Sequence, residues 1–300
     1  MSFNTSAISQ SDGEAGSNHV AVAFQFVTDL AAEVSAGRVE LPAFPEVTTR
    51  VRKALTEEHV DPGHIARLVG SEAGLAARVL MLANSAALNR SGRNVTELKT
   101  AINRIGQNHV RTAAMAFAIS QVRRSADLQP IKHELEKLWN EATTVSAMCH
   151  ALAERLPEVN SDEALLMGLI HNVGKIFILA RIHKHDELFS NHEEVHAIVR
   201  DWHANVGKAI IENWCITQSI ADAVGEHEAV DRQAGYADLT DVLTVAVLAA
   251  SFIGHEEVDI ELNMQGVRAF SRMGLDNERF LQVMSDCNAE IVAMRAALGE

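Results

Sequence analysis

The most informative stretch of the sequence is residues 164–179, ALLMGLIHNVGKIFIL. The stretch is apolar enough for a packed helix, but His171, Asn172 and Lys175 interrupt it. Polar side chains beside a packed apolar face cost free energy unless they are hydrogen-bonded or face a cavity. A single histidine in such a place is more often a hydrogen-bonded core residue than a metal ligand. From the spacing alone, both interpretations stay open.

The composition around this stretch predicts an all-α fold. The chain has 300 residues, of which 47% are hydrophobic, so it can form one large domain or two modest ones, each with a real core. Only 5 prolines and 17 glycines punctuate it, while Ala, Leu, Glu and Val are frequent. This composition favours long helices joined by short turns.

Charge and segment lengths exclude several classes of partner. The chain carries 26 Lys and Arg against 40 Asp and Glu, a net charge of −14, so nucleic acid is not an expected partner. Residues 1–19 lack the basic start and apolar core of a secretion signal, and the apolar run 242–253 is shorter than the roughly 20 residues that span a bilayer. We therefore expect a cytoplasmic protein without membrane contacts. Its three cysteines form no Cys-x-x-Cys pair that would indicate a zinc or disulfide site.

Proline, glycine and capping residues divide the chain into helices. The Ser-, Gly- and Asn-rich residues 1–18 are predicted to be a flexible tail. Asp61 and Pro62 predict an N-cap and first turn, and Ser161 predicts the cap of the helix that contains His171. The longer predicted helices are 19–35, 72–88, 107–124, 134–156, 162–182, 193–214, 219–226, 239–253 and 277–298. The polar segment 123–130 is the best internal boundary, which gives an N-terminal helical part at 19–130 and a second part at 131–300.

Several short motifs follow one another in a specific order. They are Pro42 and Pro45 in LPAFP, Asn84 and Ser85 in LANSA, Gly106 after AINRI, Trp139, and residues 168–175. Each has a structural explanation: the prolines can shape a loop, Gly106 can end a helix with a left-handed residue, and Asn84 favours a buried structural junction. Together, over residues 40–255, they resemble the HDOD family, the HD-related output domain. Residues 170–175 resemble the signature helix of the HD superfamily of metal-dependent phosphohydrolases, with Asn172 where that signature has Asp.

The resemblance implies a metal site whose ligand set is incomplete. Glu141 follows Trp139 where the family's first histidine is expected, Asn172 replaces the central aspartate, and segment 245–253 contains no acidic residue. His171, His203 and His227 match histidines of the related HD-GYP phosphodiesterases. An amide offers one neutral oxygen in place of a bridging carboxylate, so the resemblance implies no bound metal, no cofactor and no catalytic residues. It also implies two packed helical bundles, of which the second is a degenerate HD-like bundle.

A second histidine motif points to a different chemistry. His192-Glu193-Glu194-Val195-His196 matches the H-E-x-x-H pattern of zinc proteases, with Glu212 as a conceivable third ligand. A chain with 14 histidines matches such a short pattern readily by chance. No predicted strand lies nearby to align a peptide substrate. We therefore predict a solvated helix face.

The function that the resemblance implies is binding without catalysis. HDOD proteins resemble output or adaptor modules of bacterial signal transduction, often joined to receiver or cyclic di-GMP turnover domains. We expect this chain to bind a signalling protein, or a nucleotide second messenger, in a surface groove near residues 123–130. His171 and Lys175, one helical turn apart, would form a polar junction, and Gly174 would permit close helix contact. The alternative is residual metal-dependent phosphohydrolase or phosphodiesterase activity on nucleotides or cyclic dinucleotides.

Overall fold

The computed structural model describes residues 8–57, 61–89, 91–251 and 266–298, and within them it is all-helical. These ranges hold fourteen α-helices, one 3-10 helix and no strand, so the predicted all-α class is confirmed. The helices are α1 (Ile8–Ser35), α2 (Glu46–Ala54), α3 (Pro62–Gly70), α4 (Ala73–Ala83), α5 (Leu98–Arg124), η1 (Ala126–Ile131), α6 (Lys132–Ala153), α7 (Ser161–Ile170), α8 (Val173–Ile182), α9 (Asp186–Phe189), α10 (His192–Asn213), α11 (Gln218–Glu226), α12 (Leu239–Ser251), α14 (Arg268–Arg272) and α15 (Asn277–Leu298).

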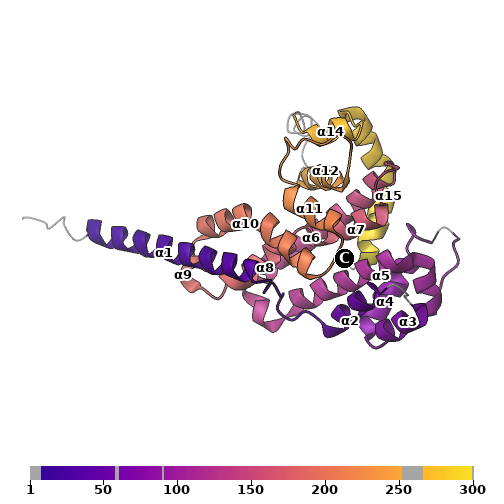
Figure 1. Ribbon diagram of the computed structural model, residues 1–300, viewed down its shortest axis with the longest axis horizontal. Coiled ribbons are helices and arrows are strands. Elements are labelled where there is room, and N and C mark those ends of the chain that lie inside the picture. Colours follow the sequence, from indigo (N-terminus) through magenta and orange to yellow (C-terminus); the bar gives the residue numbers. More distant parts are fainter. Residues whose placement is uncertain (1–7, 58–60, 90, 252–265, 299–300) are drawn as a thin grey trace, which may run out of the picture.

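The helices pack around α6 and α7, which contact each other along their length. Helix α5 packs on α7 and carries α2, α3 and α4 on its other sides, while α8, α10, α11 and α12 follow one another around the remaining face. Helix α15 contacts both α6 and α4, and α1 extends away from the body along the long axis of the molecule (Figure 1). The buried apolar side chains form one contiguous core from α1 to α15. The division into parts 19–130 and 131–300 stays a prediction.

Local sequence signals explain where several helices begin. Asp61 caps α3 as predicted, because its carboxylate accepts hydrogen bonds from the backbone N–H groups of Gly63 and His64 at 2.8 and 3.0 Å. Helix α7 is capped by Asn160 and not by Ser161, since the Asn160 side chain accepts hydrogen bonds from the backbone N–H groups of Asp162 and Glu163. The cap was therefore predicted one residue too late. An amide oxygen caps as well as a hydroxyl does, so the two neighbours compete for this position.

Two glycines bring the central helices into backbone contact. A Cβ added at Gly168 of α7 would lie 2.6 Å from the Cα of Ser146 in α6. A Cβ added at Gly174 of α8 would lie 2.0 Å from the carbonyl oxygen of His203 in α10. Only glycine permits such approaches, so the close contact predicted for Gly174 is confirmed. The contact brings α8 and α10 together beside His171.

Several predicted helix limits differ from the structure. The single helix predicted at 162–182 is two helices, α7 and α8, separated by the turn at His171 and Asn172. Helix α1 begins at Ile8 and not near His19, so only residues 1–7 of the predicted tail lie outside the described residues. A helix anchored at one end propagates through residues that add no apolar face, which composition does not reveal. Helix α4 ends at Ala83 instead of near Leu88. Gly106 has the predicted positive φ, at 74°, but ψ is 174° and the residue kinks α5 internally.

One helical stretch in the described part of the chain is long and apolar enough to cross a membrane. It is Ser161–Ile182, which comprises α7, the turn at His171 and Asn172, and α8. Its most apolar window is 89% buried inside the molecule, as expected of a central core helix. Most of its side chains pack on α5, α6, α10 and α11.

Candidate functional site

The turn between α7 and α8 places His171 in the interior of the molecule. The side chain is fully buried, and its Nδ1 lies 2.7 Å from the carbonyl oxygen of Gly168. Because a carbonyl oxygen can only accept a hydrogen bond, Nδ1 carries a proton, and Nε2 points away from α7. Nε2 has no hydrogen-bond partner and lies 3.5 Å from the Glu141 carboxylate.

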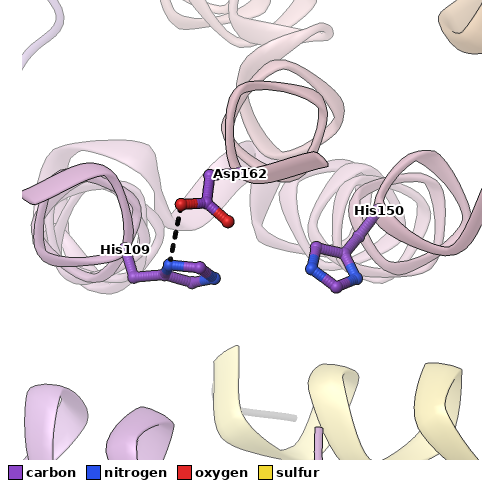
Figure 2. A group of neighbouring side chains, drawn as sticks. All are labelled: His109, His150 and Asp162. Atoms are coloured by element: carbon purple, nitrogen blue, oxygen red, sulfur yellow. Dashed lines mark ion pairs between the residues drawn. The ribbon is translucent and has the colours of Figure 1, made fainter. Parts of the chain in front are cut away.

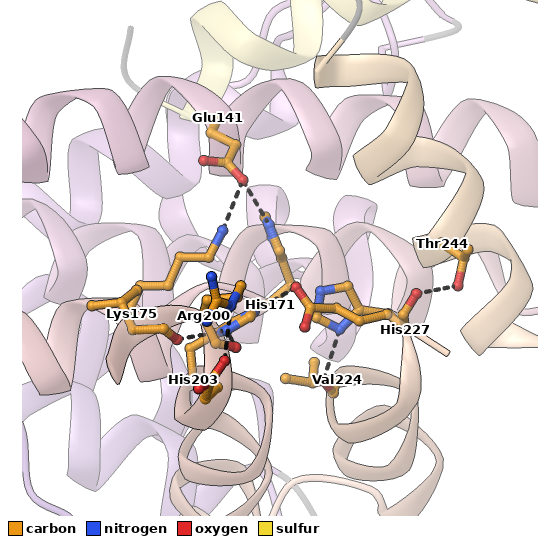
Figure 3. A network of polar contacts seen from close by, with 11 residues as sticks. Glu141, His171, Lys175, Arg200, His203, Val224, His227 and Thr244 are labelled. Atoms are coloured by element: carbon orange, nitrogen blue, oxygen red, sulfur yellow. Dashed lines mark hydrogen bonds and ion pairs between the residues drawn. The ribbon is translucent and has the colours of Figure 1, made fainter. Parts of the chain in front are cut away.

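Glu141 of α6 joins His171 to Lys175 of α8, as Figure 3 shows. The same carboxylate oxygen lies 3.3 Å from the Lys175 ammonium and accepts its hydrogen bond. Burial alone would raise the pKa of Glu141, but His171 and the positive charge of Lys175 outweigh it and lower the pKa to about 2. Glu141 is therefore ionised and paired at neutral pH.

Two further histidines complete this group. His203 of α10 and His227, which ends α11, are buried, and their rings lie 5.8 Å apart, while the ring of His227 lies 6.1 Å from that of His171. The Nδ1 atoms of both are held by backbone carbonyls, of Val199 at 2.9 Å and Val224 at 2.8 Å respectively. We call Glu141, His171, Lys175, His203 and His227 the polar cluster. All five are residues that the sequence predicted for this site.

Asn172 belongs to the same turn, but its amide is used differently. Its Nδ2 donates to the carbonyl oxygen of Leu138 in α6 at 2.8 Å, and its Oδ1 is buried without a partner. The amide therefore ties the turn to α6. In α12, the helix that ought to supply the last acidic ligand, Thr244 donates to the backbone carbonyl of His227 instead, at 2.8 Å.

Glu228 is the residue at this site that the sequence did not predict. Its carboxylate lies 3.3 Å from Nε2 of His203, and His203, His227 and Glu228 have ligand atoms within 4.8 Å of one another. Burial lowers the pKa of His203, and the negative charge of Glu228 acts in the opposite direction. Its position directly after His227 was the only signal in the sequence.

The residues of the polar cluster do not fit the one or more divalent ions that the resemblance to HD phosphohydrolases implies. Glu141 is already neutralised by the Lys175 ammonium, which also repels a cation. Asn172 offers no negative charge, and its amide nitrogen is bonded to Leu138. Magnesium and manganese prefer carboxylate oxygens, whereas this cluster presents mostly neutral imidazoles. The observed arrangement is that of a buried polar junction between α6, α8, α10 and α11.

Four of the remaining motif residues, Pro42, Pro45, Asn84 and Ser85, lie at the ends of helices or in the connections between them. The Asn84 amide donates to the Val95 carbonyl at 2.8 Å and accepts from the Val95 N–H at 2.7 Å, which is the kind of junction predicted for it. Ser85 donates to the carbonyl of Leu82, and Pro45 is the residue before the first turn of α2. Pro42 lies in the short connection between α1 and α2.

Trp139 lies under two arginines. Its side chain is 1% exposed, and the guanidinium groups of Arg78 and Arg123 lie 5.7 and 5.0 Å from the centre of its ring. This geometry is that of a cation–π interaction. Trp139 thus connects α6 to α4 and α5, two residues before Glu141.

The H-E-x-x-H motif lies on a solvent-exposed face of α10. His192, Glu193 and His196 are exposed, and only Val195 is buried. Asn191 caps this helix by accepting from the N–H of Glu194. Among the residues that the structure describes, neither histidine belongs to a group able to hold a metal ion.

The burial of His227 predicts a pH-dependent stability. Burial lowers its pKa to about 3, and the neighbouring His171 adds to this effect. Because the unfolded chain binds the proton more tightly, stability that is complete above pH 6.5 is lost as the pH falls toward 3. As the pH falls from 6.5 to 5, the buried His227 alone should lower the unfolding free energy by about 2 kcal/mol. Glu141 adds to this pH dependence of the unfolding free energy only below about pH 4.5, where its carboxyl group is protonated in the unfolded chain.

The measurement is urea unfolding of the wild type and of His227→Gln at pH 7, 6 and 5. We expect a shallower pH dependence in the variant, since glutamine does not titrate. His192→Gln, on the exposed face of α10, is the matched control and should keep the wild-type slope. Equal slopes for the wild type and His227→Gln would show that His227 does not cause the dependence.

Comparisons with known proteins agree with the helical arrangement. No curated protein matches the chain significantly. A "Putative metal-dependent phosphohydrolase" from Shewanella amazonensis has a solved structure with TM-score 0.71 and 21% identity, covering 92% of this chain and 99% of that one. An HDOD domain protein with unknown function from Geobacter sulfurreducens has TM-score 0.62 and 24% identity, covering 91% and 97%.

A "Putative signal transduction protein" from Marinobacter aquaeolei, with TM-score 0.59 and 18% identity, covers 94% of this chain and 67% of its own. At these identities the solved structures show a shared fold. The model of the HDOD domain matches residues 41–230, which is well over half of the chain and includes the whole polar cluster. The chain therefore belongs to the HDOD family.

Proposed function

We propose that this chain is a non-catalytic output or adaptor module of bacterial signal transduction, which acts in the cytoplasm by binding a signalling protein. The observation that carries the proposal is the polar cluster. Its one carboxylate is paired with Lys175, and the amide of Asn172 is bonded to Leu138. Because Glu141 and Asn172 already have these partners, they stabilise the fold and are not available as hard ligands for a metal.

A groove on the surface is the proposed binding place. A cavity of about 480 Å³ lies where the end of α5, η1 and the start of α6 meet, at the predicted boundary 123–130. This volume is within the range of known ligand sites. Its lining residues include three cations and one acid: Arg123, Arg124, Gln129, Lys132, Glu136 and Asn140.

Like charges converge around this cavity although the chain as a whole is acidic. Burial lowers the pKa of Arg78 to about 10, with further lowering by the charges of Arg123 and Arg124. An acidic surface on a partner would relieve the repulsion among these guanidinium groups. We therefore propose an acidic segment of a signalling protein as the ligand. A nucleotide second messenger would use the same positive charges.

Residual metal-dependent phosphohydrolase activity is the second candidate. One observation favours it: His171 and His203 have buried Nε2 atoms without hydrogen-bond partners, and both belong to the polar cluster. An imidazole nitrogen without a proton binds borderline metals such as zinc. The Shewanella amazonensis protein of similar fold is itself named a "Putative metal-dependent phosphohydrolase".

The variant Asn172→Asp tests the missing carboxylate. We expect no hydrolysis of a cyclic dinucleotide or of an activated phosphodiester with manganese, at any rate above that of the wild type. One restored carboxylate leaves Glu141 paired with Lys175 and α12 without an acidic ligand at 245–253. Metal-dependent turnover by Asn172→Asp that is abolished when His171→Ala is added would support the phosphohydrolase function instead.

His171→Ala separates stability from recognition. Removal of the imidazole leaves the Gly168 carbonyl and Glu141 without a contact, which should cost about 1 to 3 kcal/mol of unfolding free energy. Retention of partner proteins from an extract of the native organism should be unchanged, measured at a temperature where the variant is folded. The double charge reversal Arg124→Glu and Lys132→Glu should instead reduce the retention of partner proteins and leave the unfolding free energy nearly unchanged, since both side chains are exposed. Unchanged melting with lost binding in His171→Ala would place recognition at the polar cluster.

A further inference from the structure

Three helices meet at a second group of metal-ligating side chains, separate from the polar cluster. His109 comes from α5, His150 from α6, and Asp162 from the first turn of α7. Figure 2 shows the two imidazoles directed toward each other, with the Asp162 carboxylate beside the gap. One ligand atom of each residue lies within 4.8 Å of the other two. The three residues are far apart in sequence and form no recognisable motif.

The protonation of His109 leaves one nitrogen directed into this gap. Its Nδ1 lies 2.9 Å from the carbonyl oxygen of Ile105, so Nδ1 carries the proton and donates it there. Nε2 is then an acceptor, and it is buried without a hydrogen-bond partner in a side chain that is 4% exposed. An unsatisfied buried acceptor is costly, which is why such atoms usually have a ligand or an ordered water. Backbone carbonyls orient metal-binding histidines in the same way.

Asp162 supplies the negative charge that a cation requires. Its carboxylate lies 3.4 Å from Nδ1 of His109 and is 36% exposed, so the gap is open to solvent on this side. His150 is 4% exposed, as buried as His109.

We propose that His109, His150 and Asp162 form a zinc-binding site that joins α5, α6 and α7. Two imidazole nitrogens and one carboxylate oxygen are the donor set of many zinc sites, with water as the fourth ligand. Donors around a tetrahedral zinc lie about 3.4 Å apart, so side-chain rotations that bring the three ligand atoms closer by at most about 1.4 Å complete the site. Bound zinc links α5, on which α2, α3 and α4 pack, to the two central helices α6 and α7.

The test is zinc retention by the full chain after removal of metal, reloading and gel filtration, with zinc affinity measured against a chromophoric chelator. We expect the wild type to retain one zinc ion per chain. Asp162→Asn should lower the affinity at least about tenfold, and His109→Gln and His150→Gln should abolish retention. Asp162→Asn removes a partly exposed charge with little change in shape, so it keeps the test decisive if the buried variants fold poorly.

Two controls exclude the other histidines. His203→Gln alters the group of His203, His227 and Glu228, and His192→Gln alters the exposed motif of α10, so both should keep the zinc. Cobalt in place of zinc should give the visible absorption of a tetrahedral site in the wild type and lose it in Asp162→Asn. A wild type that retains no zinc, or zinc that is lost in His203→Gln and kept in Asp162→Asn, would overturn the proposal.

Discussion

Gly174→Ala is expected to abolish stable folding, although alanine is the better helix former. The added Cβ would lie 2.0 Å from the carbonyl oxygen of His203 and 2.7 Å from the backbone nitrogen of Gly207. Both neighbours are backbone atoms of α10, so no side-chain rotation relieves the clash. Helices α8 and α10 would have to separate, and this would disrupt the buried contacts of His171 and His203.

The expected cost is at least about 4 kcal/mol, the upper range for overpacking, against about 1 kcal/mol gained in helix propensity. Typical domains have only about 5 to 15 kcal/mol of stability in total. Soluble yield, helical circular dichroism and urea unfolding measure the effect. Gly235→Ala is the matched control, because nothing lies within 4 Å of a Cβ at that position. A Gly174→Ala protein that unfolds at the same urea concentration as Gly235→Ala would contradict the close packing.

Asp241→Asn is expected to have the second largest effect. Asp241 of α12 is 1% exposed, and its carboxylate accepts hydrogen bonds from Arg272 of α14 at both oxygens and from Arg232 at 3.1 Å. The amide keeps the shape but removes the charge and turns a donor toward the guanidinium groups. Breaking a buried ion pair from one side costs about 3 to 5 kcal/mol.

Urea unfolding at neutral pH measures this loss. Asp238→Asn is the control, since Asp238 pairs with one arginine, Arg232, and its side chain is 33% exposed. The asparagine oxygen can still accept the hydrogen bond that Asp238 accepts from the N–H of Asp241. We expect this partly exposed pair to contribute less than the buried Asp241 pairs, about 1 kcal/mol. Similar small losses in both variants would show that the arginines find other partners when the Asp241 charge is removed.

Most of the helical fold could be predicted from local signals. The Asp61 and Pro62 pair predicted the start of α3 correctly, because a capping side chain acts on its own next residues. Limits set by tertiary contacts were predicted less well. Asn160 and Ser161 are equally good caps in sequence, and only the structure shows that Asn160 is the one used. The kink at Gly106 also depends on how α5 meets its neighbours.

The candidate site could be predicted only as far as its motif extends. Glu141, His171, Lys175, His203 and His227 follow the family pattern, and the structure brings them together. The bond from Asn172 to the Leu138 carbonyl depends on helix packing and has no signature in the sequence. The same is true of His109, His150 and Asp162, which come from three helices without regular spacing.

The most direct test of the central claim, that the polar cluster supports the fold and catalyses nothing, is one rate measurement. Purified wild-type chain is incubated with cyclic di-GMP and manganese, and the release of linear dinucleotide is followed. We predict a rate equal to that of the buffer with manganese alone, and an unchanged rate in His171→Ala. Manganese-dependent release by the wild type, lost in His171→Ala while that variant remains folded, would contradict it.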